Sequence, residues 1–167
     1  MSALGNHSQF DVAGEPLRNV APLWRGAMIE RYARTEHFVL RSLKCLAQHR
    51  IALCDNAFAP LPKVRLNALI LALRKNDFEQ RQLPALASLE DLQSRWDERN
   101  ALSHGRFRVG ARSVTVIWTA MDKGPVEKNL TLQVTDMLER LAALDTLQRV
   151  LGARLGHVDA ACKRRAP

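Results

Sequence analysis

A chain of 167 residues, with 47% hydrophobic and 25% charged residues, is long enough to fold around a hydrophobic core without disulfide bonds. Its 25 Lys and Arg outnumber its 17 Asp and Glu, and the net charge of +8 makes nucleic acid the first partner to consider, although proteins that bind no nucleic acid can be equally basic. No apolar run reaches the roughly 18 residues of a membrane-spanning helix and no leader pattern is present, so we expect a cytoplasmic protein that makes no membrane contact.

The cysteines give little reason to expect a metal. Cys45, Cys54 and Cys162 are odd in number and form no C-x-x-C pair, which is typical of reduced thiols. Cys45, His49 and Cys54 could be imagined as zinc ligands, but no second Cys/His pair accompanies them. The sequence also contains no Gly-rich phosphate loop, HExxH pair or EF-hand, so we expect no cofactor.

We expect the chain to have three parts. Residues 1–20 mix Gly, Ser, Asn and Pro with little periodicity, which predicts an irregular N-terminal arm. Residues 21–158 are expected to form a single domain. Residues 159–167 include three consecutive basic residues and predict a flexible basic tail.

The first helix is expected from Pro22 to near Arg50, because apolar residues recur there at helical spacing. Its predicted buried face consists of Trp24, Met28, Tyr32, Val39, Leu43 and Leu46.

Glu36 falls within an apolar column of this helix, where a carboxylate needs a partner. Arg99 would serve if the first helix packs against the helix that contains Arg99. Alternatively, Glu36 lies at the edge of the buried face and pairs with Arg34, Arg41 or solvent.

A second helix is predicted from about Pro62 to Asn76, since proline is suited to a first helical turn. Its buried face is expected to contain Leu66, Leu69, Ile70 and Leu73. The basic residues off that face are typical of a solvated surface, and they are Lys63, Arg65, Arg74 and Lys75.

A third helix is predicted to start near Ser88, after a polar break at residues 77–84. The string Ser-Leu-Glu-Asp from Ser88 has the form of an N-terminal cap. Leu89, Leu92 and Trp96 follow at helical spacing and predict the buried stripe of this helix.

The stripe of the third helix turns polar near its end. Asn100, Ser103 and His104 continue the face of Trp96, where another leucine would pack best. Burying polar groups costs stability, which indicates that something other than packing selected them. Gly105 predicts that the helix then ends in a left-handed conformation.

Arg99, Asn100 and His104 lie in the string Arg-Asn-x-x-x-His-Gly, which resembles the arginine-x4-histidine motif of the HEPN superfamily. Over roughly Trp24 to Gly156, the resemblance implies a small helical bundle, usually dimeric and in many members a metal-independent ribonuclease. It implies that the three motif residues are catalytic and that the substrate is RNA.

The residue types suit that chemistry. RNA is cleaved without a metal when the ribose 2′-hydroxyl attacks the adjacent phosphorus, which requires a base, an acid and a cation. Histidine transfers protons near neutral pH, and arginine binds phosphate oxygens. We therefore expect His104 as acid or base, Arg99 as the cation and Asn100 beside them, with Glu36 and Ser103 in support.

One motif supplies only one histidine, whereas cleavage asks for two proton-transfer groups or one group used twice. HEPN ribonucleases pair two motif helices across a dimer axis, so the resemblance implies a homodimer with a composite site. It also allows a toxin or phage-defence effector with an antitoxin or nucleotidyltransferase partner.

Two other interpretations stay open. Glu36, Arg99, Asn100 and His104 could form a buried polar network that only fixes helix packing. HEPN relatives with intact motifs also act as partners, so the chain could be a non-catalytic nucleic-acid-binding or regulatory module.

After Gly105 the pattern alternates with a period of two, which predicts a small antiparallel hairpin or three-stranded meander over about residues 106–134. Arg106, Arg108 and Arg112 stand at its entry, where they could contact RNA phosphates or simply solubilise the strands.

A last helix is predicted from Thr135 or Asp136, with a buried face of Leu138, Leu141, Leu144, Val150, Leu151 and Leu155. The expected fold is therefore mainly α. The resemblance makes it a HEPN-like bundle of about four helices with the β insertion before the last one.

Overall fold

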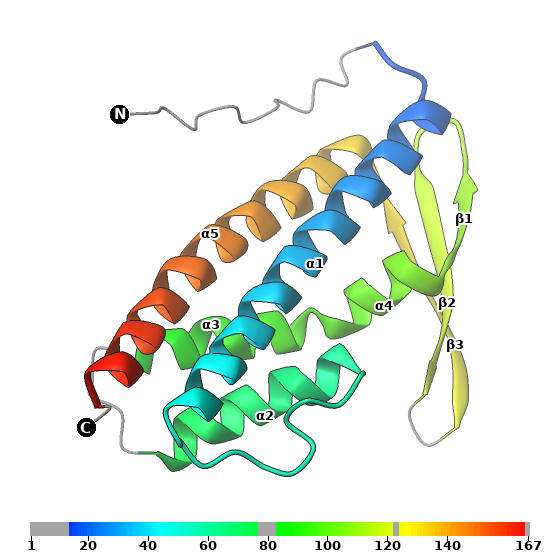
Figure 1. The fold of residues 1–167 in the computed structure, drawn as a ribbon. Coiled ribbons are helices and arrows are strands. Elements are labelled where there is room, and N and C mark those ends of the chain that lie inside the picture. The colour runs from blue at the N-terminus through cyan, green and yellow to red at the C-terminus, as the bar shows by residue number, and fades with distance from the viewer. Residues whose placement is uncertain (1–13, 77–82, 122–123, 166–167) are drawn as a thin grey trace, which may run out of the picture.

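The computed structural model describes residues 14–76, 83–121 and 124–165, in which five helices pack around one core and a small sheet lies at one end (Figure 1). In chain order the elements are α1 (Leu17–Gln48), α2 (Pro62–Lys75), α3 (Leu83–Ser94), α4 (Trp96–His104), β1 (Arg106–Val109), β2 (Val114–Met121), β3 (Pro125–Leu132) and α5 (Val134–Arg165). The mainly α fold and the meander before the last helix are as predicted. None of the described helices contains a stretch long and apolar enough to cross a membrane.

The two long helices, α1 and α5, lie side by side and run in the same direction (Figure 1). Near their starts, Trp24 Nε1 donates to the Met137 carbonyl over 2.7 Å, and further along Arg31 pairs with Asp145. The predicted buried face of α1 is confirmed, since each of its six residues is at most 2% exposed. Burial of such large apolar side chains is the main stabilising contribution to this fold.

Both long helices extend further than expected. Residues 17–20 belong to the first turn of α1 and not to an irregular arm, because Leu17 and Val20 continue the apolar stripe toward Trp24. In α5, Val158 and Cys162 are fully buried at a spacing of four, so residues 159–165 of the expected tail are helical. Residues 1–13, 166 and 167 lie outside the described residues.

The predicted third helix is in fact two helices, so the described residues form five helices and not about four. α3 begins at Leu83, well before Ser88, and Pro84 occupies its first turn. Ser88 is buried within α3 and caps nothing; its hydroxyl accepts a hydrogen bond from Arg154 Nη1 over 2.7 Å. α3 ends at Ser94, and Arg95 has the bridge-region backbone (φ −88°, ψ 6°) that separates it from α4.

The three strands form an antiparallel meander in the order β1-β2-β3. Phe107, Val116 and Leu130 are aligned across it, as are Trp118 of β2 and Lys128 of β3. Val114 and Val116 are fully buried, so their face of the sheet covers the end of the helical bundle. Because side chains alternate along a strand, Trp118 and Lys128 lie on that same face.

The last helix begins at Val134, one residue before the expected start. Asp136 then lies in the first turn, where its carboxylate accepts a hydrogen bond from the Gln133 backbone N–H over 2.8 Å. Leu141, Leu144, Leu151 and Leu155 are buried as predicted, whereas Leu138 and Val150 are only half-buried.

Candidate functional site

The polar residues of α4 lie on two sides of the helix. Trp96, Ala101 and Leu102 are buried, while Asn100 and Ser103 are half-buried and His104 is exposed. The expectation that Asn100, Ser103 and His104 continue the buried stripe was wrong, because Ala101 and Leu102, and not these three residues, are buried after Trp96 in α4. Their burial therefore costs less than the sequence pattern indicates.

Asp97, Asn100 and His104 are spaced at i, i+3 and i+7, so they share one face of α4. That face borders a pocket of about 530 Å³ between α4, the sheet and the start of α2. The residues around it are mostly polar: Lys63, Asp97, Asn100, His104, Trp118, Thr119, Ala120, Met121 and Lys128. Two of the three motif residues thus meet at one cavity of the size that small-molecule sites usually have.

The wall of the pocket opposite α4 is formed by the second half of β2 and by Lys128 of β3. Lys128 reaches back to α4, where its Nζ lies 3.0 Å from Asp97 Oδ2. Trp118 stands directly across the strand pair from Lys128 and is half-buried. Lys63, in the first turn of α2, contributes the second lysine of the pocket.

Arg99 lies away from this pocket and packs against α1. Its Nε donates to Glu36 Oε1 over 2.9 Å, and the two side chains are only 21% and 17% exposed. The Arg99 guanidinium also lies 5.6 Å from the centre of the Trp96 ring. Of the two arrangements that we considered for Glu36, the structure therefore contains the pair with Arg99.

The closed four-residue network that we considered is absent. Among the described residues, neither Asn100 nor His104 forms a hydrogen bond with the Glu36–Arg99 pair. The ion pair fixes helix packing, but Asn100 and His104 face the pocket instead. Packing between α1 and α4 therefore does not explain these two side chains.

The chain leaves α4 at Gly105, and neighbouring atoms of α4 and β2 leave no room for a side chain there. A β-carbon on Gly105 would lie 2.3 Å from the Ala101 carbonyl oxygen and 2.8 Å from Val116 Cγ1. Its φ is −73°, so the expected left-handed conformation was wrong. The absence of a side chain, and not backbone freedom, explains glycine at this position.

Arg25 is a residue that sequence reasoning missed. From α1 its Nε donates to the Leu102 carbonyl over 2.6 Å and its Nη2 to the Ser103 carbonyl over 3.2 Å. Its guanidinium lies 4.7 Å from the centre of the Phe107 ring. A cation thus binds the last carbonyls of α4 and holds the end of the helix from which His104 projects. In the sequence, nothing but the position of a charged residue next to the buried Trp24 points to this role of Arg25.

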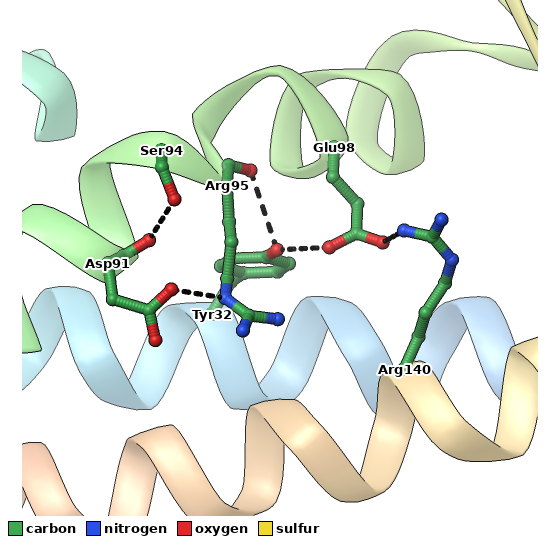
Figure 2. A network of polar contacts seen from close by, with 6 residues as sticks. All are labelled: Tyr32, Asp91, Ser94, Arg95, Glu98 and Arg140. Carbon is green, nitrogen blue, oxygen red and sulfur yellow. Dashed lines mark hydrogen bonds and ion pairs between the residues drawn. The ribbon is translucent and has the colours of Figure 1, made fainter.

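A second set of contacts holds the break between α3 and α4 against α1 and α5 (Figure 2). Glu98 accepts hydrogen bonds from the Tyr32 hydroxyl over 2.8 Å and from Arg140 Nη1 over 2.6 Å. The Tyr32 oxygen also lies 3.5 Å from the Arg95 carbonyl oxygen, and Arg95 in turn pairs with Asp91. The Glu98 carboxylate of α4 therefore contacts both α1 and α5, immediately before Arg99 in the sequence.

Tyr32 should make stability fall at alkaline pH. Burial, and then the Glu98 carboxylate, raise the pKa of its hydroxyl above the ordinary value of 10.0. The unfolded chain releases this proton first, so the contribution is complete below about pH 10 and is lost above it, at up to roughly 1.4 kcal/mol per pH unit.

Because Tyr32 is the only tyrosine, tyrosinate absorbance reports on it alone. We expect no tyrosinate signal in the native protein just above pH 10, followed by its appearance together with unfolding. Tyr32→Phe, which has no signal, should show a shallower loss of stability over the same pH range. A native protein that ionises Tyr32 reversibly near pH 10 while keeping its circular dichroism would contradict this.

The three arginines predicted to bind RNA do not reach the pocket. Arg106 and Arg108 pair with Ile117 and Thr115 of β2, so they lie on the face of the sheet turned away from the helices. Arg106 is highly exposed and lies 3.5 Å from Glu127. Arg112 is exposed in the turn between β1 and β2. The three arginines are therefore exposed basic residues that follow His104 in the chain, and they do not line its pocket.

Another cavity, of about 540 Å³, lies between α3 and α5. It is lined largely by small and apolar side chains such as Ala87, Ala143 and Val150, and none of its lining residues is a histidine. The pocket beside α4 is therefore the better candidate for chemistry. Within the described part of the chain, no cluster of three or more His, Cys, Asp or Glu residues is placed to hold a metal ion.

Comparisons of the chain with models of protein families, with curated protein sequences and with solved structures found no match.

Proposed function

We propose that this protein is a cytoplasmic, metal-independent endoribonuclease of the HEPN type that acts as a homodimer. The observation that carries the proposal is the pairing of Asn100 and His104 at a polar pocket in a chain of net charge +8. Histidine is the side chain best suited to proton transfer near neutral pH, and an exposed imidazole can reach a phosphodiester from solvent.

In the proposed reaction, one imidazole takes the proton of a ribose 2′-hydroxyl. The 2′-oxygen then bonds to phosphorus, the bond from phosphorus to the 5′-oxygen breaks, and the same imidazole, now protonated, returns its proton to that oxygen. The products are a 2′,3′-cyclic phosphate and a 5′-hydroxyl. Arg99 stabilises the negative charge on the phosphorane, and Asn100 contributes its amide to the same substrate.

The positions of Arg99 and His104 around α4 support a composite site to which two chains contribute. Arg99 and His104 are five residues apart, which places them roughly 140° apart around a helix. Glu36 also holds Arg99 against α1, away from the pocket that His104 borders. We therefore propose that the Arg99 of one chain serves the His104 of the other across a two-fold axis.

The test of the function is incubation of the purified protein with single-stranded RNA in EDTA. We expect cleavage that leaves 2′,3′-cyclic phosphate ends. An RNA with one 2′-deoxyribose at the cut position should resist cleavage there, since the attacking hydroxyl is missing. Cleavage that requires a divalent metal, or that proceeds equally at the deoxyribose, would contradict the proposal.

The second candidate is a non-catalytic module that binds nucleic acid or regulates a partner. The two lysines of the pocket favour it, because they can bind phosphate without any chemistry. In that case RNA would stay intact, and its binding would weaken steeply with salt.

We also propose that a cleaving enzyme of this kind is a toxin or phage-defence effector, since unrestrained RNA cleavage would harm the cell that makes it. Control by an antitoxin or a nucleotidyltransferase partner follows from the resemblance. Co-expression with such a partner should then relieve any growth arrest that the protein causes.

A further inference from the structure

We infer that the pocket beside α4 binds one unpaired nucleobase of a single-stranded RNA, stacked on Trp118, with Lys63 and Lys128 on the flanking phosphates. The inference rests on the proposed function for its choice of RNA, and it adds the form of the substrate and the residues that select it. It assigns a role to Trp118, Lys63 and Lys128, none of which belongs to the motif.

Trp118 is placed as a stacking platform. Val114 and Val116 precede it on the same face of β2 and are fully buried, but Trp118 lies beyond the end of the core and borders the pocket while remaining half-buried. An indole kept partly open beside a polar cavity is accessible to a ligand in that cavity. Stacking on an aromatic side chain is the usual way in which proteins hold an unpaired base.

The polar groups around Trp118 fit a base better than they fit an apolar ligand. The Asn100 amide carries both a donor and an acceptor, as the edge of a base does. Asp97 supplies a carboxylate acceptor, already held 3.0 Å from Lys128 Nζ. A volume of about 530 Å³ also leaves room for a ribose beside the base.

The charges of the pocket explain why the ligand would be a nucleotide within a strand. Lys63 comes from α2 and Lys128 from β3, so two cations meet at the pocket from different elements. His104 borders the same cavity, which would bring the phosphate next to the bound base within reach of the imidazole. A nucleotide inside a duplex is already paired and stacked between its neighbours, so it cannot enter the pocket, and the site should select single strands.

Tryptophan fluorescence gives a direct readout, because Trp24 and Trp96 are buried and Trp118 alone is partly exposed. The probes are unlabelled RNA octamers of one base each, an abasic octamer, and a hairpin RNA of the same charge. All are titrated into His104→Ala, which prevents cleavage. We expect saturable quenching by the single-stranded octamers and little by the abasic or hairpin RNA.

Two further variants in the His104→Ala background assign the quenching to the indole. Trp118→Ala should weaken octamer binding by between about 5-fold and 150-fold and abolish the quenching. Trp118→Phe, which keeps a stacking ring and the fold of the sheet, should bind within a few-fold of the parent. Equal binding of octamer, abasic and hairpin RNA, unchanged affinity in a folded Trp118→Ala, or no binding at all would overturn the inference.

Lys63 has a matched control at the other end of its own helix. Lys63→Ala should reduce the slope of log affinity against log salt by about 0.7, the value for one phosphate contact with a single strand. Lys75→Ala removes the same charge from α2 outside the pocket and should leave the slope unchanged. Equal effects of the two substitutions would indicate that RNA is attracted by the overall positive charge of the protein, and this would overturn the assignment of Lys63.

Failure of this inference and failure of the proposed function can be told apart. If the octamers quench Trp118 but wild-type protein leaves RNA intact, the base pocket stands and the nuclease does not. If wild-type protein cleaves RNA in EDTA but Trp118→Ala binds octamers as before, the nuclease stands and the base pocket does not.

Discussion

Replacement of His104 by alanine is expected to lower the rate of RNA cleavage by roughly 10²–10⁴-fold, the usual contribution of a general acid or base. His104 is exposed at the end of α4 and borders the pocket with Asn100, so its imidazole can reach substrate without any movement of the core. Because it is exposed, the free energy of unfolding should change by no more than about 0.5 kcal/mol. The measurement is a single-turnover cleavage rate, with the RNA-binding affinity and thermal midpoint of the same preparation.

The matched control is His157→Ala, which removes an exposed histidine of α5 outside the pocket. It should cleave RNA at the rate of the wild type. If His104→Ala keeps the wild-type rate, or if both variants lose activity equally, His104 is not the proton-transfer group.

The largest expected effect on stability comes from a single methyl group at Gly105. Gly105→Ala places a carbon 2.3 Å from the Ala101 carbonyl oxygen of α4 and 2.8 Å from Val116 of β2, so both the last turn of α4 and its packing against β2 must change. Overpacking of this kind costs about 1–3 kcal/mol. In a chain of this length that is a fall of several degrees in thermal midpoint, roughly 2–4 °C per kcal/mol. Cleavage should fall as well, since His104 is the preceding residue.

Gly26→Ala is the control, with the opposite sign expected. Gly26 lies on the exposed side of α1, where an added carbon meets nothing within 4 Å. Alanine is the better helix former by about 1 kcal/mol, so this variant should be more stable than the wild type. If Gly105→Ala is as stable as Gly26→Ala, the close packing between α4 and β2 is not as described.

Periodicity in the sequence predicts most of the framework. The buried face of α1 and the alternation of β2 each depend on residues close together in the chain, and both are correct. The extent of α1 and α5 was underestimated because Pro22 and the basic C-terminal residues look like boundaries. In each helix, buried residues beyond the apparent boundary, such as Val20 in α1 and Cys162 in α5, outweigh the local preference for a helix end.

The break between α3 and α4 could not be read from the sequence, since no Gly or Pro lies there. Its stabilising contacts come from distant parts of the chain, namely Tyr32 of α1 and Arg140 of α5, which meet at Glu98 (Figure 2). For the same reason the pocket was not foreseen. Lys63 resembles any solvated lysine of α2, and only the folded chain brings it beside Asn100 and Trp118.

The central claim is that Arg99 of one chain works with His104 of the other, and subunit mixing tests it most directly. Arg99→Ala and His104→Ala proteins, each inactive alone, are mixed, allowed to exchange subunits, and assayed for RNA cleavage in EDTA. A mixed dimer has one intact Arg99 and one intact His104, on different chains, so the account predicts that activity returns. Mixed dimers that are shown by mass to have formed but leave RNA intact would contradict it, as would a wild-type protein that cleaves RNA as a monomer.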